Sequence, residues 1–325
     1  MIGVYLPNDA GMVTGGAEAV SASALWVDLV NPSPDEILAV ETATGTAIPA
    51  RDSMEEIEAS SRMIRRKGSL VMTVPILTGS TGGSPRNSAV TFILSSHRLV
   101  TVRYDTPRAF DSYIADLHSL AHQPTSPGEI LLGVVEAIID RIADLLEELG
   151  RELDAASHRI FHQPSQQRRH HRASSRELEA LLRTIGRDGD LSGRARETLL
   201  GLRRMAAFLP HTDDALGVSG AHDRVETIGH DLQSLSEYVD FLGSKTNFLL
   251  DATLGVINIQ QNQVIKLFTI MSVLFLPPTL VASWYGMNFK AIPELQWDYG
   301  YPYAIALAVL AAALPYWIFK RKGWM

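Results

Sequence analysis

Two long runs without a charged side chain lie near the C-terminal end of this sequence. Between Lys266 and Lys290 there are 23 uncharged residues, and between Asp298 and Lys320 there are 21. A helix needs about 20 mainly apolar residues to cross the hydrocarbon core of a bilayer. The core helices of soluble proteins seldom stay free of charge for so long. The two runs therefore predict transmembrane helices at residues 266–287 and 301–319.

The rest of the chain has the composition of a soluble protein. The hydrophobic share is 46%, the formal net charge is −7, and there is no cysteine. The absence of a basic excess argues against a nucleic-acid partner, and the lack of cysteine excludes disulfides and thiolate metal sites. The N-terminal sequence MIGVYLPNDAG has neither the basic start nor the apolar core of a signal peptide. We therefore expect most of the chain to lie in the cytoplasm.

Charges and aromatic residues orient the two spans. Lys266 precedes the first span, and a basic tail of Lys320, Arg321 and Lys322 follows the second. Positive charge collects on the cytoplasmic side of membrane proteins, so both termini are predicted to be cytoplasmic, with these four residues as a basic inner ring. The outer ends carry aromatic residues, as expected of an interfacial belt: Trp284, Tyr285, Trp297, Tyr299, Tyr301 and Tyr303.

The sequence before the spans divides into three segments. Residues 1–120 read as an α/β domain with strands at Leu25–Leu29, Leu70–Leu77, Ala89–Leu94 and Leu99–Arg103, and a helix at Pro34–Thr44. Residues 121–220 are helical, with breaks at Phe161–Ala173 and Pro210–Gly220. A stalk helix, 221–265, then leads into the first span as one helix of well over fifty residues. The loop GSTGGSPRN (79–87) lacks the Gly-Lys-Ser/Thr ending of a phosphate loop, so no nucleotide is expected.

A polar stripe runs along the end of the stalk and the first span. Its members recur in alternating steps of four and three, the period of helices that wrap around a common axis. Lipid cannot satisfy polar groups, so such a stripe predicts a pore-lining face; helix packing through small residues is the alternative. The stripe comprises Asp251, Gly255, Asn258, Asn262, Ile265, Thr269, Ser272, Leu276, Thr279 and Ser283.

A sequence motif follows the first span directly. It reads Tyr285-Gly286-Met287-Asn288-Phe289, and Ile292-Pro293-Glu294-Leu295 comes soon after it. This layout resembles the CorA-type divalent-cation transporters, which carry a Gly-Met-Asn triplet at the outer end of the first of two C-terminal spans. The resemblance covers the whole chain, from the α/β domain through the stalk and both spans to the basic tail. The fold class is therefore an α+β membrane protein.

The resemblance implies a homopentamer that takes up Mg²⁺ passively, often with Co²⁺ and Ni²⁺. It also implies regulatory cation sites between the cytoplasmic domains, built from Asp and Glu. Asp28, Glu55, Glu56 and Asp231 are candidates for such sites, but no motif assigns any of them.

Residue chemistry gives the triplet and the stripe their expected roles. Gly286 can end the helix in a left-handed turn, and Asn288 then offers an amide oxygen at the pore mouth. Mg²⁺ dehydrates reluctantly, so Asn288 is expected to bind the waters of a hydrated ion; a plain helix cap is the alternative. Ile265 and Leu276, with Phe268 one step off the stripe, are suited to a hydrophobic gate.

The expected function is passive uptake of Mg²⁺ through the plasma (inner) membrane, not enzymatic catalysis. The membrane potential supplies about 4.6 kcal/mol per 100 mV for a divalent ion. Neither span contains a carboxylate that could relay protons. The alternatives are a Zn²⁺ transporter of the same fold, proton-linked or not, and a membrane-anchored regulator with a closed pore. Met287 in the triplet favours Mg²⁺.

One basic segment has no part in this scheme. His158 and His162 lie one helical turn apart, a spacing that can hold a transition metal, but the neighbouring arginines favour an exposed basic turn. His170, His171 and three arginines follow in the same segment. Helix lengths place this turn roughly 14 Å below the membrane. Contact with anionic lipid headgroups is one hypothesis for this turn; a solvated turn with counterions is the alternative, because the distance exceeds a Debye length of about 8 Å.

Overall fold

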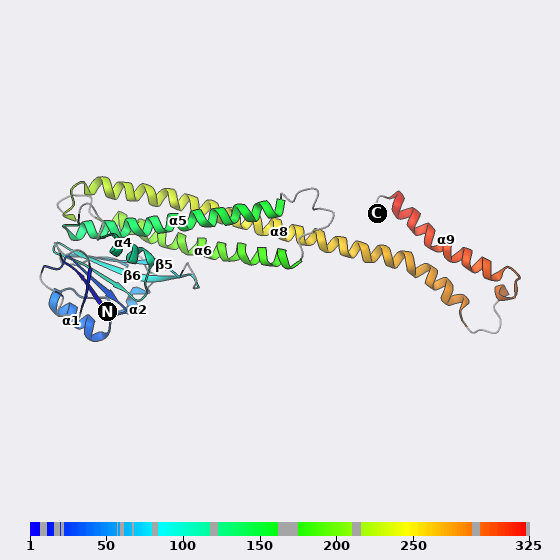
Figure 1. Cartoon of the computed structure of the whole chain (residues 1–325), viewed down its shortest axis with the longest axis horizontal. Coiled ribbons are helices and arrows are strands. Elements are labelled where there is room, and N and C mark those ends of the chain that lie inside the picture. The colour runs from blue at the N-terminus through cyan, green and yellow to red at the C-terminus, as the bar shows by residue number, and fades with distance from the viewer. Residues whose placement is uncertain are drawn as a thin grey trace. The chain divides into compact units, whose positions relative to one another are not determined.

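The computed structural model describes residues 1–6, 12–15, 20, 23–56, 58, 62–66, 68–79, 84–117, 123–161, 175–209, 216–287 and 293–322. These residues belong to two compact units, Met1–Asp251 and Ala252–Met325, which are treated separately below. The elements follow in chain order, and Figure 1 labels most of them: β1 (Ile2–Tyr5), β2 (Met12–Gly15), β3 (Trp26–Val30), α1 (Pro34–Thr44), α2 (Arg51–Met54), β4 (Met63–Arg66), β5 (Ser69–Thr78), β6 (Arg86–Ser95), β7 (Leu99–Arg103), α4 (Arg108–Asp116), α5 (Pro127–Phe161), α6 (Ser175–Phe208), α8 (Ala221–Tyr285), η3 (Pro293–Gln296) and α9 (Gly300–Arg321).

The N-terminal unit contains a seven-stranded mixed sheet in the order β2-β1-β3-β7-β6-β5-β4. Only β3 and β7 pair in parallel; every other neighbouring pair is antiparallel. The four predicted strands correspond to β3, β5, β6 and β7 and are confirmed. The sequence analysis missed β1, β2 and β4, because each has four residues, too few to show an alternating pattern.

Helix α1 has the bounds that the sequence predicts. The Ser33 hydroxyl accepts a hydrogen bond from the Glu36 amide at 3.2 Å, and the Glu36 carboxylate accepts one from the Ser33 amide at 2.8 Å. This reciprocal pair is a capping box. At the other end, Gly45 adopts a φ of 64° and stops the helix in the left-handed region.

Helices cover both faces of the sheet (Figure 1). On one face, Val27, Leu29, Val100 and Val102 pack with Val40 of α1 and Met54 of α2. On the other face, the sheet packs against α4, α5 and the helices beyond, through the largest buried side chains of the domain: Tyr5, Trp26, Met72, Phe92 and Phe110. The result is a three-layer domain with one helical layer much thicker than the other.

A buried ion pair lies between β3 and β7. The Arg103 guanidinium donates to Asp28 at 2.8 Å, and the two side chains are only 4% and 2% exposed. The Thr101 hydroxyl donates to the same carboxylate at 2.6 Å and accepts from the Trp26 indole at 2.9 Å. Asp28, one of the acidic candidates for a regulatory cation site, is therefore fully engaged inside the fold and is withdrawn from that role.

The thick layer is a three-helix bundle of α5, α6 and the first part of α8 (Figure 1). Helix α8 enters the core with residues spaced mainly by three and four: Ala221, Val225, Ile228, Leu232, Val239, Leu242 and Leu249. Arg224 pairs with Glu136 and Lys245 with Asp154, each at 2.7 Å, so α5 runs parallel to α8. The predicted stalk is thus packed into the N-terminal unit up to Asp251.

Helix α6 runs antiparallel to α8. The Ser192 hydroxyl donates to the Val239 carbonyl at 3.5 Å, and Arg196 pairs with Asp240 at 3.2 Å. Further along α8, the Thr246 methyl group lies against Gly189. The basic turn falls at residues 162–174, outside the described residues, so its predicted contact with headgroups stays a prediction.

The C-terminal unit holds the rest of α8, the short helix η3 and α9. Helix α8 continues through Pro277 and Pro278 and spans 65 residues, which confirms one helix of well over fifty residues. Both α8 and α9 contain stretches long and apolar enough to cross a membrane.

One carboxyl group lies among the apolar side chains of the bundle. Asp188 of α6 is 1% exposed and occupies a core position between Ile185 and Leu191. Its Oδ2 atom has no hydrogen-bond partner among the described residues, while its Oδ1 accepts from Arg187 at 3.3 Å. Burial raises the pKa of this carboxyl to about 6; Glu152 adds to the rise and Arg187 opposes it.

The raised pKa of Asp188 predicts that this residue lowers the free energy of unfolding by an amount that depends on pH. Because the folded state binds the proton more tightly than the unfolded chain, the Asp188 contribution to stability falls as pH rises from about 4 to 6 and is least favourable above that range. Asp188→Asn should therefore raise the free energy of unfolding by about 1–2 kcal/mol at pH 7.5 and change it little at pH 4.5. Thermal unfolding of the full-length protein in detergent at both pH values measures this.

Asp190→Asn is the matched control, because Asp190 lies on the same helix with a 57% exposed side chain paired to Arg194. Its effect should stay within about 0.5 kcal/mol at either pH. An Asp188→Asn protein that is no more stable than the parent at pH 7.5 contradicts the prediction.

Candidate functional site: the polar face of helix α8

The predicted polar stripe lies on an uncovered face of α8. Nearly all of its residues are exposed in the single chain. The face of α8 that is partly covered carries Val273, Leu274, Pro277, Val281 and Tyr285. At about 100° per residue, this covered face lies roughly opposite Ser272, Thr279 and Ser283. The stripe therefore points away from the side on which α8 meets the rest of its unit.

The threonine hydroxyls of the stripe have a fixed direction. Thr269 donates to the Ile265 carbonyl at 2.8 Å, and Thr279 donates to the Phe275 carbonyl at 2.6 Å. Each hydroxyl proton is thus used within the helix, as is common for threonine in helices. The oxygen lone pairs remain free as acceptors on the exposed face, where they can bind the protons of water molecules around a cation.

The apolar members of the stripe are as exposed as the polar ones. The exposed fractions are 61% for Ile265, 66% for Leu276 and 65% for Phe268. Such large apolar side chains are not stable in water over a long stretch. They interrupt the polar positions, so the face alternates between sections that attract water and sections that repel it.

The end of α8 differs from the prediction in one respect. Gly286 does not adopt a positive φ, so the left-handed turn expected there is wrong. Its amide still donates to the Ala282 carbonyl at 2.9 Å, and a Cβ at this position would lie 3.0 Å from that carbonyl oxygen. The close approach of the Ala282 carbonyl, and not backbone handedness, explains the glycine. Met287 is 46% exposed; Asn288 lies outside the described residues, so its role stays a prediction.

Residues 293–300, the described part of the loop between the spans, pack closely on one another. The Glu294 carbonyl of η3 lies against Gly300, where any larger residue would clash. The loop and the two helix ends enclose a cavity of about 490 Å³ lined by Val281, Tyr285, Trp297 and Tyr301, among others. Five of the six aromatic residues of the predicted belt are exposed, with 58% for Trp297 and 79% for Tyr301, while Tyr285 is half-buried.

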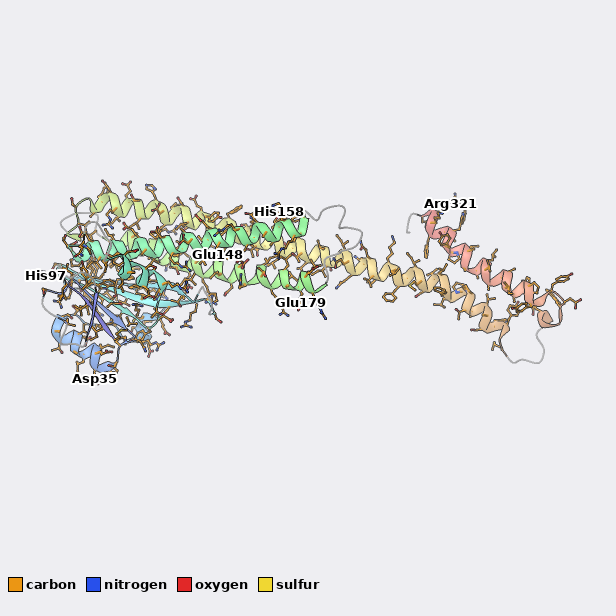
Figure 2. The ribbon with its side chains drawn as sticks, in the orientation of Figure 1. Asp35, His97, Glu148, His158, Glu179 and Arg321 are labelled. Atoms are coloured by element: carbon orange, nitrogen blue, oxygen red, sulfur yellow. The ribbon has the colours of Figure 1, made fainter. Side chains whose placement is uncertain are left out.

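Of the four predicted inner-ring residues, one lies within α8 and three lie at the C-terminal end of α9. Lys266, Lys320, Arg321 and Lys322 all have accessible side chains. Arg321, labelled in Figure 2, stacks over the Trp317 ring at 5.2 Å. An aromatic ring beneath a guanidinium is typical of a membrane interface.

A second group of polar residues lies on the N-terminal unit. Glu136, Asp140 and Asp144 recur every four residues on α5, and Asp231 of α8 is near enough to act on Asp140. Burial raises the pKa of Asp140, and Glu136, Asp144 and Asp231 raise it further. Among the described residues, Arg224 pairs with Glu136, while Asp140, Asp144 and Asp231 have no cationic partner. These carboxylates make this flank of the bundle acidic, but their oxygens do not converge on one point; among the described residues, His222, Asp223 and Glu226, all exposed, are the group whose ligand atoms lie within 4.8 Å of one another.

The sequence analysis singled out only Asp231 of this group. The regular spacing of Glu136, Asp140 and Asp144 was the available signal, because residues four apart share a helix face. Glu55, another candidate, instead pairs with Arg51 at 3.7 Å.

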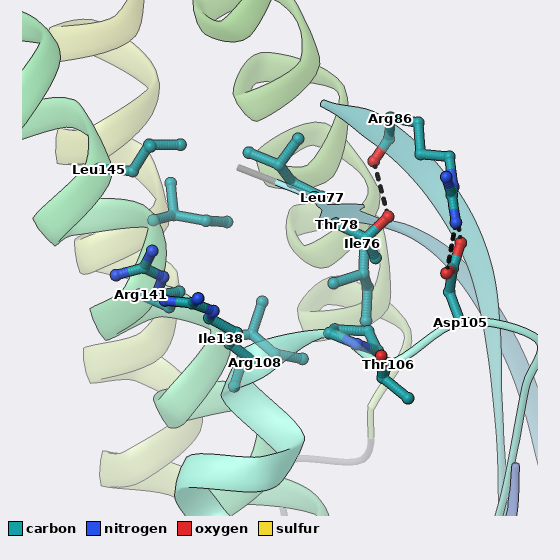
Figure 3. Close-up of a pocket in the computed structure, with 14 residues that line it drawn as sticks. Ile76, Leu77, Thr78, Arg86, Asp105, Thr106, Arg108, Ile138, Arg141 and Leu145 are labelled. Carbon is teal, nitrogen blue, oxygen red and sulfur yellow. Dashed lines mark hydrogen bonds and ion pairs between the residues drawn. The ribbon is translucent and has the colours of Figure 1, made fainter. Parts of the chain in front are cut away.

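A third feature, a cavity of about 260 Å³ between the sheet and α5, is basic (Figure 3). Arg86 pairs with Asp105 at 2.7 Å, and this guanidinium holds the pKa of the Asp105 carboxyl below its usual value. Arg108 and Arg141 also line the cavity, and neither has an ion pair within the described part of the chain. Its net positive charge makes this cavity unsuitable for a divalent cation.

These features define a class of protein. A three-layer N-terminal domain leads through one continuous helix into a polar-faced apolar segment, followed by a short aromatic loop and a second apolar helix. This is the architecture of a two-span membrane transporter. Residues 21–321 match the family described as CorA-like Mg²⁺ transporter protein, and the chain belongs to that family.

Relatives and solved structures agree with this placement. The chain is 36% identical over 304 residues to the magnesium transport protein CorA of Yersinia pseudotuberculosis, with 94% of this chain and 93% of the relative covered. It is 35% identical over 305 residues to the protein of that name in Escherichia coli K12, covering 93% and 92%. The complete CorA magnesium transporter of Methanocaldococcus jannaschii matches with a TM-score of 0.69 at 18% identity, covering 92% and 91%.

A second full-length structure, that of the CmaX protein, gives a TM-score of 0.71 at 18% identity and covers 99% of this chain and 97% of that one. The structural matches establish the fold. Together with family membership, they make the chain a two-span inner-membrane protein with a cytoplasmic N-terminal domain.

Proposed function

We propose that this chain forms a homopentameric pore in which five copies of α8 surround one axis and Mg²⁺ enters passively. The observation that carries the proposal is the uncovered polar stripe of α8, which runs through an otherwise apolar segment. A polar face in the membrane is stable only when it lines water or other polar groups. The homopentamer is the assembly implied by the family resemblance, and Co²⁺ and Ni²⁺ would share the path.

The stripe suits an ion that keeps its water. Mg²⁺ holds its first hydration shell tightly, so a favourable path offers acceptors for the shell's protons and does not replace the waters. The outward lone pairs of Thr269 and Thr279 are such acceptors, and the amides of Asn258, Asn262 and Asn288 are the others in this proposal. Asp251 adds negative charge at the inner mouth. Neutral oxygens bind the hydrated ion weakly enough for release.

The apolar positions supply a barrier in this proposal. Rings of Ile265, Leu276 and Phe268 would exclude water from the path unless the helices separate, which is gating by dewetting. The membrane potential then drives entry, and the basic residues Lys266, Lys320, Arg321 and Lys322 anchor the inner ends of the spans to anionic lipid.

We also propose that Mg²⁺ acts as a regulatory ligand on the cytoplasmic unit. The carboxylates of Asp140, Asp144 and Asp231 repel one another, and an ion that neutralises them would stabilise the bundle in which α8 is packed. Internal Mg²⁺ would then favour the arrangement of α8 that holds the pore closed.

Asn288→Ala should lower Mg²⁺ entry at least about tenfold, which corresponds to about 1.4 kcal/mol in the barrier. The amide oxygen that receives the hydrated ion at the outer mouth is lost, while the apolar packing of the spans is unchanged. Purified protein in liposomes under a defined inside-negative potential, with a Mg²⁺-sensitive dye inside, measures the rate.

The same liposomes, tested with Co²⁺ and Zn²⁺, separate Mg²⁺ transport from the Zn²⁺ alternative. Protein that carries Zn²⁺ but no Mg²⁺, or that carries neither, overturns the proposed function. A well-assembled Asn288→Ala protein with parental flux overturns only the role of that residue.

Leu276→Ser and Ile265→Ser should each raise flux at high internal Mg²⁺, roughly threefold or more, because a hydroxyl wets the constriction. Leu267→Ser is the matched control: Leu267 is 58% exposed but lies two residues from Ile265, on the far side of the helix. Dye flux is measured without internal Mg²⁺ and with high internal Mg²⁺, and the two rates are compared between each variant and the parent. Equal flux and equal inhibition in all three variants would rule out a gate at these positions.

The regulatory proposal has its own test in thermal unfolding. Added Mg²⁺ should raise the midpoint of the parent protein, since a ligand that binds only the folded state stabilises it. The double variant Asp140→Asn with Asp144→Asn should lose more than about half of that rise, whereas Asp190→Asn should keep it. An unchanged response in the double variant removes these carboxylates from the site.

A further inference from the structure

Two unlike surfaces flank α8 near Asp251, and neither is covered in the single chain. One is a ridge of aromatic residues, and the other is a groove lined by glycines. Both follow the three-and-four spacing of helices that pack along a seam, so each has the form of a helix-packing surface. Nothing in the pore proposal accounts for them.

The ridge runs along the edge where α8 meets α5. Its members Tyr238, Phe241 and Phe248 are 37%, 56% and 60% exposed, and Phe161 at the end of α5 is 46% exposed. The Tyr238 and Phe241 rings lie 6.2 Å apart, and the Phe161 and Phe248 rings 5.8 Å apart. Lys245 completes the seam: its ammonium lies 5.9 Å from the Phe241 ring and pairs with Asp154 at 2.7 Å. The exposed rings are thus already ordered by their neighbours.

The groove runs along the opposite edge, where α8 meets α6. It has a volume of about 510 Å³ and is lined by Gly186, Gly189 and Gly193 of α6 and by Gly243 of α8, among others. A Cβ atom built on Gly186, Gly193 or Gly243 meets nothing within 4 Å. These positions are therefore open to the outside and are not filled by the chain's own packing.

We propose that the aromatic ridge of one copy packs into the glycine groove of the next copy, and that this contact closes the ring around the pore. This inference rests on the proposed function, because the polar stripe of α8 needs other copies of α8 to enclose it. Ridge and groove lie on either side of the face opposite the buried stripe. Each copy then offers one of each, which is the arrangement of a head-to-tail contact that closes into a ring.

The levels of the two surfaces along the bundle agree with this contact. Rotation about a pore axis leaves every residue at its own height, so a ridge residue meets groove residues of the same level. Asp240, next to Phe241, pairs with Arg196 of α6 at 3.2 Å. Gly193 lies within one helical turn of Arg196, so Phe241 is close to the level of Gly193. Phe248 follows Thr246, whose methyl group lies 3.1 Å from the position of a Cβ on Gly189, and so is near the level of Gly186. Buried aromatic anchors in pockets are what stable interfaces use.

The natural absence of cysteine allows a direct test. Full-length Phe241→Cys and Gly193→Cys chains, distinguished by size tags, are co-expressed and oxidised in the membrane. A disulfide needs Cα atoms within about 7 Å, so a mixed tagged dimer forms only if the two surfaces meet between copies. Phe248→Cys with Gly186→Cys tests the second level. Chains carrying both cysteines of one pair should give a ladder of linked copies.

Three comparisons make the outcome decisive. Glu148→Cys, on an exposed part of α5 away from the ridge (Figure 2), paired with Gly193→Cys should give no mixed dimer. Dimers of Phe241→Cys alone would mean that two ridges meet, and would overturn the proposal. Absence of mixed dimers at both levels, in reduced variants that still transport Mg²⁺, would also overturn it while leaving the pore intact. Cross-linked rings without ion flux would instead support the contact and contradict the proposed function.

Discussion

Helix α8 has to satisfy two environments with one continuous backbone. Up to Asp251 it contributes Val225, Leu232, Leu242 and Leu249 to a protein core, so one of its faces is fixed by packing against α5 and α6. Beyond that residue the helix is apolar, yet it keeps a polar stripe at the same three-and-four period. The first part of α8 therefore follows the demands of a protein core, and the second part those of a membrane segment. A carboxylate such as Asp188 in that packing is therefore costly, since it weakens the part of the molecule that holds α8 in place.

The fold separates its charges by function. Asp28 and Arg103 neutralise each other between β3 and β7, and a pair buried this deeply contributes little net stability but leaves a costly unpaired charge when one partner is lost. The cavity beside β5 collects arginines, whereas the outer face of α5 collects carboxylates without cationic partners in the described chain. The helical layer therefore carries an acidic surface on α5 and a basic cavity beside the sheet. This separation gives an acidic flank on the same bundle that holds α8.

The sequence predicted the long elements well and the short or buried details poorly. The bounds of α1 follow from Ser33, Glu36 and Gly45, whose capping chemistry is local. The spans and the polar stripe were readable because twenty uncharged residues and a regular period leave few alternatives. Strands β1, β2 and β4 are too short for a periodic signal. The burial of Asp28 depends on Arg103, which is distant in sequence. Gly286 was assigned to a left-handed turn because glycine often serves there, but its constraint is a neighbouring carbonyl that only the structure shows.

In the pore proposed above, the chemistry of hydrated Mg²⁺ explains why the stripe is nearly free of carboxylates. A ring of five carboxylates in a low-dielectric pore would hold a divalent cation strongly, and strong binding slows release. The hydroxyl protons of Thr269 and Thr279 are already used in hydrogen bonds within the helix. Their oxygens therefore accept hydrogen bonds from hydration water and do not donate to it. Asp251, the one acidic member, lies at the cytoplasmic end, where water screens its field. Charge is thus placed where it attracts ions, and neutral oxygen where ions must keep moving.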